Sequence, residues 1–228
     1  MMKRSLFLTL LFLIEGSIPS RAEICQQLIQ RNPATKNDQN LERMKDLALN
    51  SPEFKERAAA ASAVLTGYQI PESVRGLTQA RELIRSPNSW CRWWGYQFLS
   101  YLDLAQVRDA SSKRDLASGL KDSDPEVRVS AVQGLSALGD ADLIALLQKT
   151  FTSDASPKVR ERAACCLSHT GVYSKAQRVK FVPFFIGVIE DITVEEQTKN
   201  WAVQALNYIT GVNYGRDIKQ WKNWEKIN

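Results

Sequence analysis

The residues with the most reactive side chains are one histidine, His169, and four cysteines. Cys166 lies three residues before His169, so on a helix the two could imitate a nucleophile and its base, or two metal ligands. Neither set is complete, because no second histidine exists and a metal site needs more ligands than this pair supplies. We therefore predict that Cys166 is a small buried side chain and that no chemistry occurs at this pair.

Sequence patterns that would indicate other catalysis are also absent. The chain has no glycine-rich phosphate loop, no paired catalytic carboxylates, and neither an HExxH nor a GxSxG motif. These absences favour a protein without enzyme activity, cofactor or metal.

A cluster of aromatic residues around an arginine is the strongest candidate for a binding surface. It comprises Trp90, Arg92, Trp93 and Trp94. Trp90 meets both other tryptophans at helical spacings of three and four, so the three rings can share one face. Aromatic and arginine side chains of this kind dominate protein interfaces and can stack on sugars or bases, but they also fill cores. Both interpretations stay open at this stage.

The first 22 residues have the pattern of a secretory signal peptide. Lys3 and Arg4 precede a ten-residue apolar run, and small residues lie before a predicted cleavage between Ala22 and Glu23. The alternative is an uncleaved anchor, although ten apolar residues fall short of the roughly 20 needed to span a bilayer. No later segment is apolar enough to span one. We expect an exported protein, periplasmic or secreted, whose net charge falls from +5 to +3 with the loss of three basic residues and one acidic residue.

Four prolines mark the elements that must position these residues. Pro52, Pro87, Pro125 and Pro157 each follow a Ser or Asp and recur at intervals of 35, 38 and 32 residues. Such pairs predict helix starts, because the side-chain oxygen caps a free amide and proline lacks the amide that would stay unpaired. Helical apolar stripes follow each start, and Gly139 and Gly171 predict helix ends.

The repeats at 122–152 and 153–191 resemble HEAT-like repeats of the short bacterial kind that also occurs in phycobilin lyases. The resemblance depends on Asp124-Pro125-Glu126-Val127-Arg128 with Ala131 and Leu135, and on the matching segment from Ser156 to Leu167. It implies an all-α, right-handed α-α superhelix of four to five helical pairs, because one short pair cannot bury its stripe alone. The repeat at Pro87 departs most, with Trp93 where a small residue belongs.

We predict one repeat domain over 23–228 after the signal peptide at 1–22. Its expected repeats are 23–49 (partial), 50–85, 86–121, 122–152, 153–191 and 192–228. Arg128 and Arg160 occupy equivalent positions 32 residues apart, and in this class such arginines form inter-repeat ion pairs or cap carbonyls. An arginine ladder that recognises a phosphate or carboxylate partner is the alternative.

The cysteine positions and this stacking order together predict four free thiols. Cys25, Cys91 and the Cys165–Cys166 pair fall in different first helices, about two repeats apart. At roughly 8–10 Å per helix layer, the Cα atoms would lie about 20 Å apart, whereas a disulfide needs about 4.4–6.8 Å.

The C-terminal segment carries Tyr214, Asp217, Trp221 and Trp224. It looks like a tail found on exported bacterial HEAT-like proteins. We expect its aromatic side chains to cap the open end of the stack, with ligand binding as the alternative.

The leading functional hypothesis is a non-catalytic scaffold or adaptor that binds a protein or peptide partner along its helical surface. The alternatives are a bilin-lyase-like cofactor-attachment factor and a HEAT-like nucleic-acid-binding protein. Export argues against both, and the modest mature charge also weakens nucleic-acid binding. The single histidine excludes the multi-histidine iron site of HEAT-repeat hydroxylases.

Overall fold

The computed structural model describes residues 25–27, 39–107, 109, 111–169 and 171–227, and this part of the chain is helical and contains no strand. The predicted signal peptide and its cleavage site at Ala22 and Glu23 lie outside the described residues. The helices are α2 (Gln39–Asn50), α3 (Phe54–Gly67), α4 (Val74–Ile84), α5 (Ser89–Leu104), α6 (Ser112–Ser118), α7 (Pro125–Leu138), α8 (Ala141–Ser153), α9 (Pro157–Ser168), α10 (Lys175–Val179), α11 (Val182–Glu190), α12 (Glu196–Thr210) and α13 (Ile218–Ile227).

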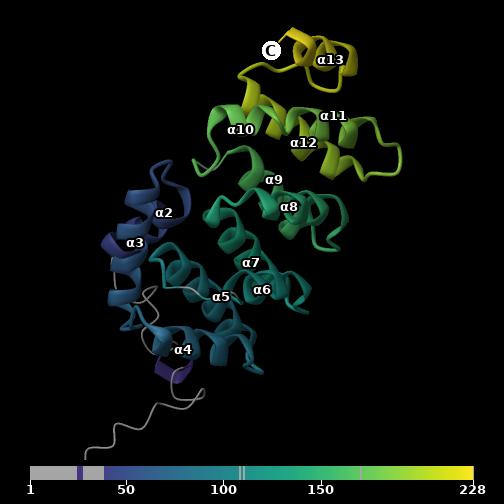
Figure 1. The fold of residues 1–228 in the computed structure, drawn as a ribbon. Helices are drawn as coiled ribbons and strands as arrows, with labels where there is room; N and C mark the ends of the chain where they lie inside the picture. The colour runs from purple at the N-terminus through teal and green to yellow at the C-terminus, as the bar shows by residue number, and fades with distance from the viewer. Residues whose placement is uncertain (1–24, 28–38, 108, 110, 170, 228) are drawn as a thin grey trace, which may run out of the picture.

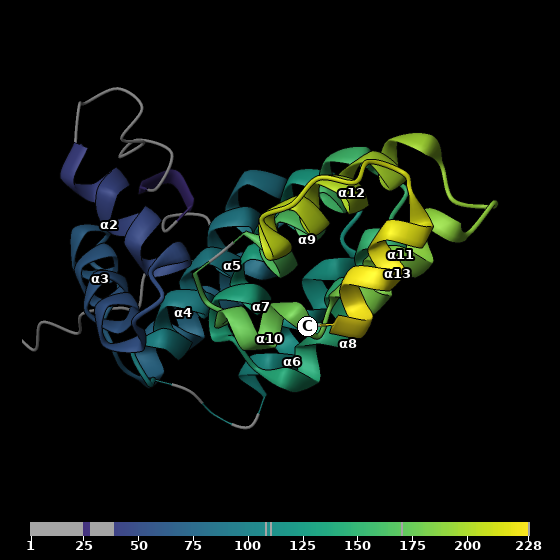
Figure 2. The same ribbon diagram turned by 90° about the horizontal axis from the view of Figure 1, so that it is seen from above.

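The helices stack as an α solenoid, as the sequence predicts (Figure 1). The first helices of successive pairs, α5, α7, α9 and α12, pack directly on one another. The second helices are α6, α8, α11 and α13, and they form the other layer of the stack (Figure 2). Buried apolar side chains form one continuous core from Cys25 to Trp221, which fills the space between the two layers and extends to the helices beside them. Among the described residues, no helix has the length and apolar character needed to cross a membrane.

Two of the four prolines begin helices and two do not. Pro125 and Pro157 are the first residues of α7 and α9, with Asp124 and Ser156 as their N-caps. Pro52 and Pro87 instead lie one residue before the N-caps, which are Glu53 and Asn88. In those two loops the hydroxyl oxygens of Ser51 and Ser86 accept a hydrogen bond from the N-cap amide, so the serine and proline form a turn before the helix starts.

This difference moves the register of the predicted repeat at 86–121 by two residues, because its helix is capped by Asn88 and not by Ser86. The position aligned with Ala131 and Ala163 is therefore Gly95 and not Trp93. A Cβ on Gly95 would lie 2.7 Å from the backbone nitrogen of Ile84, so α4 and α5 approach as closely as a glycine allows. Trp93, which appeared to break the repeat pattern, therefore lies outside the close contact between α4 and α5, and the small residue expected at that contact is Gly95.

The α2–α3 hairpin departs from the regular stack and stands along its side (Figure 1). Its lower end contacts α5, where Tyr68 packs against Trp94 and Phe98. Its upper end reaches the loop after α9, where a Cβ on Gly171 would lie 2.5 Å from the carbonyl oxygen of Asn50. The hairpin therefore spans several repeats instead of adding one more layer.

A disulfide joins Cys25 to Cys91, with the Cα atoms 5.6 Å apart, so the prediction of four free thiols is wrong. The prediction assumed that each predicted repeat adds one layer to the end of the stack. Residue 25 instead lies beside the start of α5, where it is buried. Cys165 and Cys166 form no disulfide, as expected.

Candidate binding grooves between repeats

A ladder of arginines joins each repeat to the next. Arg92, Arg128 and Arg160 occupy the same position in α5, α7 and α9, and each Nη1 donates to two carbonyl oxygens of the loop just before its own helix. The remaining edge of each guanidinium points to the following repeat. These bonds satisfy carbonyls that would otherwise lack partners, and they fix the loop against the helix.

The first two arginines bind a carboxylate with both remaining nitrogens. Arg92 donates to the two oxygens of Asp122 over 2.7 and 2.8 Å, and Arg128 donates to those of Asp154 over 2.9 Å each. The same aspartates accept the amides of Asp124 and Ser156, which start the next helix. Hydrogen bonding to Asp154 raises the pKa of Arg128. Each aspartate thus serves two repeats at once.

The third arginine uses different partners. Arg160 donates through Nε to Thr198 over 3.0 Å and through Nη2 to Glu195. Its side chain is only 9% exposed, whereas Glu195 is 60% exposed. The last of these positions is Lys199, which pairs with Glu196 in its own helix. All the arginine nitrogens have protein partners at Arg160, which favours the structural role expected for Arg128 and Arg160 over recognition of an anionic partner.

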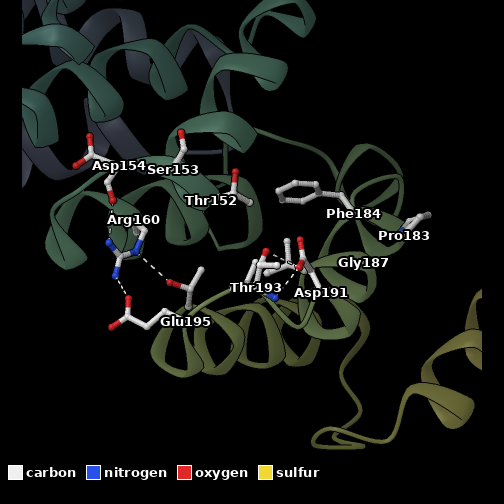
Figure 3. Close-up of a pocket in the computed structure, with 13 residues that line it drawn as sticks. Thr152, Ser153, Asp154, Arg160, Pro183, Phe184, Gly187, Asp191, Thr193 and Glu195 are labelled. Carbon is white, nitrogen blue, oxygen red and sulfur yellow. Dashed lines mark hydrogen bonds and ion pairs between the residues drawn. The ribbon is translucent and has the colours of Figure 1, made fainter.

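Two cavities open beside this ladder, one on each side of the end of α8. We call the larger one the acidic groove; it measures about 660 Å³ and lies between α8, α9, α11 and α12 (Figure 3). Its lining residues are Thr152, Ser153, Asp154, Arg160, Pro183, Phe184, Gly187, Val188, Asp191, Thr193, Val194, Glu195 and Thr198. Phe184, Val188 and Val194 supply an apolar wall, while the carboxylates of Asp191 and Glu195 lie at the loop before α12.

The second cavity, which we call the lysine groove, measures about 440 Å³ and lies one repeat earlier. Its lining residues are Ala117, Leu120, Lys121, Asp122, Arg128, Leu146, Lys149, Thr150, Ser153, Asp154 and Ala155. Ser153 and Asp154 line both grooves, so the two cavities are neighbours on one surface. Sequence reasoning missed both grooves, because neither is a contiguous motif. Aligning the arginines with the acids that follow them would have indicated their position.

The tryptophan-rich helix is divided between core, ladder and surface. Trp94 is 2% exposed and packs against Tyr68 and Phe98, so it belongs to the core. Arg92 is a member of the ladder. Trp90 is 38% exposed and stacks on Trp93 with ring centroids 5.1 Å apart. Of the four predicted binding residues, Trp90 alone therefore presents a large exposed side chain.

The C-terminal aromatics cover the end of the stack. Trp221 is fully buried, contacts Tyr214, and donates its indole hydrogen to the Gly215 carbonyl oxygen over 3.0 Å. The Asp217 carboxylate accepts the amide of Gln220 at the start of α13, and Trp224 is half-buried against the core. Their contacts hold α13, at the top of Figure 1, on the end of the stack.

The Cys166–His169 pair lacks the properties of a reactive centre. Both residues line a cavity of about 350 Å³ between α2, α7 and α9, but burial raises the pKa of the Cys166 thiol to about 12. His169 is exposed and packs on the ring of Tyr208. Within the described part of the chain, no group of three or more His, Cys, Asp or Glu residues is arranged to hold a metal ion.

Comparison with known proteins bears on the family but not on the activity. No curated protein matches the chain. The structure of human deoxyhypusine hydroxylase in complex with glycerol aligns at 13% identity over 85% of this chain and 97% of that chain, with a TM-score of 0.28. The family model of HEAT repeats matches residues 97–168 and 114–207. These matches run from within α5 to within α12, and the chain therefore belongs to the HEAT-like repeat family.

Proposed function

We propose that this protein is a non-catalytic binding protein, exported to the cell envelope or beyond, which holds a protein or peptide partner along the grooves between its repeats. The observation that carries the proposal is the presence of two neighbouring grooves built on the same ladder. Stacked repeats that each contribute one groove form an extended surface, which suits an extended ligand and needs no reactive residue.

The chemistry of the grooves also favours binding over catalysis. Both lining arginines, Arg128 and Arg160, are held in ion pairs within the protein. The hydroxyl groups of Thr152, Ser153 and Thr198 have no histidine among their neighbours in the lining. A hydroxyl nucleophile needs an adjacent base. Selective contacts with a partner are therefore the role that these side chains support best.

The disulfide supports the proposed location. Disulfides persist in oxidising compartments such as the periplasm and are rare in the cytosol. Cys25, which forms the disulfide with Cys91, follows the predicted cleavage site closely in the sequence. The disulfide and the predicted signal peptide therefore both favour export. Expression in a Gram-negative host tests this step: the full-length chain should appear in the periplasm as a shorter, oxidised species, and a cytosolic, reduced product of full length would contradict it.

Site-specific photo-crosslinking tests the binding function. A benzoylphenylalanine at Gly187 would enter the acidic groove, and this position has room because a Cβ there meets no atom within 4 Å. The matched control is a benzoylphenylalanine at Tyr208, which is exposed on a first helix outside both grooves. We expect a discrete protein adduct from an envelope extract at Gly187 and none at Tyr208. Absence of an adduct at Gly187, or equal adducts at both positions, would refute the assignment of partner binding to this surface.

A further inference from the structure

The two grooves have the same construction but opposite charge. The acidic groove is lined by three carboxylates, Asp154, Asp191 and Glu195, against one arginine. The lysine groove is lined by three basic residues, Lys121, Arg128 and Lys149, against two aspartates. The net charge of the lining therefore changes from negative to positive within one repeat.

Ion pairs within the protein neutralise part of the charge in each groove. Asp154 pairs with Arg128, and Asp122 with Arg92, so these side chains neutralise one another. Lys121 and Lys149 are exposed and form no ion pair with another residue of the described ranges. On the other side, Asp191 is exposed, and Glu195 remains 60% exposed despite its bond to Arg160.

The local environment favours the ionised form of the Asp191 carboxylate. Hydrogen bonds from the side chain and the amide of Thr193 lower the pKa of Asp191. Phe184 and Val188 lie in the same cavity, so the methylene stem of a long side chain could pack there while its charged end meets the carboxylates. Lysine and arginine have this combination of apolar stem and cationic end.

We propose that the partner is an extended peptide segment with an acidic side chain in the lysine groove and a lysine or arginine side chain in the acidic groove. This inference rests on the proposed function and specifies the chemistry of its ligand. Neighbouring helices are about 8–10 Å apart. A peptide in the extended polyproline II conformation rises about 3.1 Å per residue and returns to the same face every three residues, so the two charged side chains are about three residues apart in the peptide.

Fluorescence anisotropy with defined peptides tests this charge pattern. The probes are three fluorescein-labelled nonapeptides of the same length and apolar content, with Glu and Lys, two Glu, or two Lys placed three residues apart. Each exposed ion pair contributes a modest attraction, so at low salt we expect the mixed peptide to bind about threefold to tenfold more tightly than the others. Equal affinities, or no measurable binding of any probe, would overturn the proposal.

Charge reversal in one groove should switch the preference. The double variant Lys121→Glu, Lys149→Glu should bind the peptide with two lysines best, while Asp191→Asn, which keeps the hydrogen-bond acceptor for Thr193, should weaken only the probes that carry lysine. Lys175→Glu is the matched control, since Lys175 is exposed on α10 and lines neither groove. If Lys175→Glu changes the preferred peptide in the same way, the effect comes from overall charge, and the assignment of the two charges to the grooves is wrong.

The outcomes of the two experiments are separable. An adduct at Gly187 together with charge-independent peptide binding would leave the proposed function in place and reject the charge pattern. The predicted order of peptide affinities without any envelope adduct would support the charge pattern and reject the proposed cellular partner.

Discussion

The regular stack and the α2–α3 hairpin are fastened by different means. From α5 to α12, the same polar joint recurs: a guanidinium caps its own loop and binds the side chain of the next. Arg57 of α3 also caps its own loop through Nη1. The hairpin meets α5 through other contacts, for example the Lys45 ammonium, which lies 5.8 and 5.2 Å from the ring centroids of Tyr68 and Trp94, and the segment before the hairpin is joined to α5 by the Cys25–Cys91 disulfide. Repeated joints make the stack depend on many equivalent positions, whereas the hairpin depends on a few unique ones.

Removal of one ladder arginine should cause the largest loss of stability. Arg128→Ala leaves Asp154 and two loop carbonyls without their partner, and loss of one member of a largely buried pair typically costs about 3–5 kcal/mol. Denaturant unfolding monitored by circular dichroism measures the change. Lys158→Ala is the control, since its pair with Glu126 is exposed and should cost at most about 1 kcal/mol.

A second substitution keeps this test interpretable if Arg128→Ala fails to fold. Arg128→Lys keeps the charge but cannot bind both oxygens of Asp154 and both carbonyls at once. We expect an intermediate loss of stability. A lysine variant as stable as the parent protein would show that the ladder contributes charge alone and not its geometry.

Breaking the disulfide should affect the hairpin and spare the stack. Cys25→Ser with Cys91→Ser removes a crosslink between residues 66 apart, and loss of such a bond typically costs about 2–4 kcal/mol. Amide hydrogen exchange should accelerate in α2 and α3 but stay slow in α7 and α9. Uniform acceleration along the whole chain would show that the hairpin and the stack unfold as one unit.

Replacing glycine by alanine should lower stability where α4 and α5 are in close contact and raise it in the acidic groove. Gly95→Ala places a Cβ 2.7 Å from backbone and side-chain atoms of Ile84 and should cost about 1–3 kcal/mol. Gly187→Ala meets no atom within 4 Å and should stabilise α11 by about 0.5–1 kcal/mol. Thermal unfolding of both variants measures the pair. Equal shifts would contradict the difference in packing between these two positions.

Acid should weaken the stack through Asp122. Burial raises the pKa of this carboxyl, but the hydrogen bonds from Arg92 and the Asp124 amide outweigh burial, so the pKa is lowered overall. The contribution of this carboxylate is therefore present above the usual aspartate pKa of about 3.9 and is lost as the pH falls through the lower folded value. Denaturant unfolding of Asp122→Asn below pH 5 should show a smaller pH dependence than the parent protein, and an unchanged slope would exclude Asp122 as a source.

The sequence predicts the stack well because its determinants are local. Each repeat of 122–191 has its capping residue, proline, arginine and small residue within about ten positions of one another. Each of these helix pairs can therefore be predicted from its own residues. The same arginine pattern extends to Arg92, and proline alignment concealed it because Pro87 belongs to the loop before the N-cap.

The hairpin and the grooves could not be derived from the same local signals. The path of the N-terminal segment back to α5 depends on long-range packing, such as Tyr68 on Trp94, and no repeat spacing encodes it. The charge of each groove arises from residues on different helices, for example Lys121 and Lys149. Only the stacked structure brings these side chains to one surface.

The sharing of Asp122 and Asp154 between successive repeats limits how such a chain can be shortened or lengthened. A boundary drawn between two repeats separates an arginine from the acid that completes it, and the cut end would hold an orphaned charge. Deletion or duplication of a segment that begins and ends within equivalent helices would preserve every arginine–acid partnership. The segment that can be deleted or duplicated without breaking these pairs therefore runs from the middle of one first helix to the middle of the next, and its ends do not coincide with the ends of a helix pair.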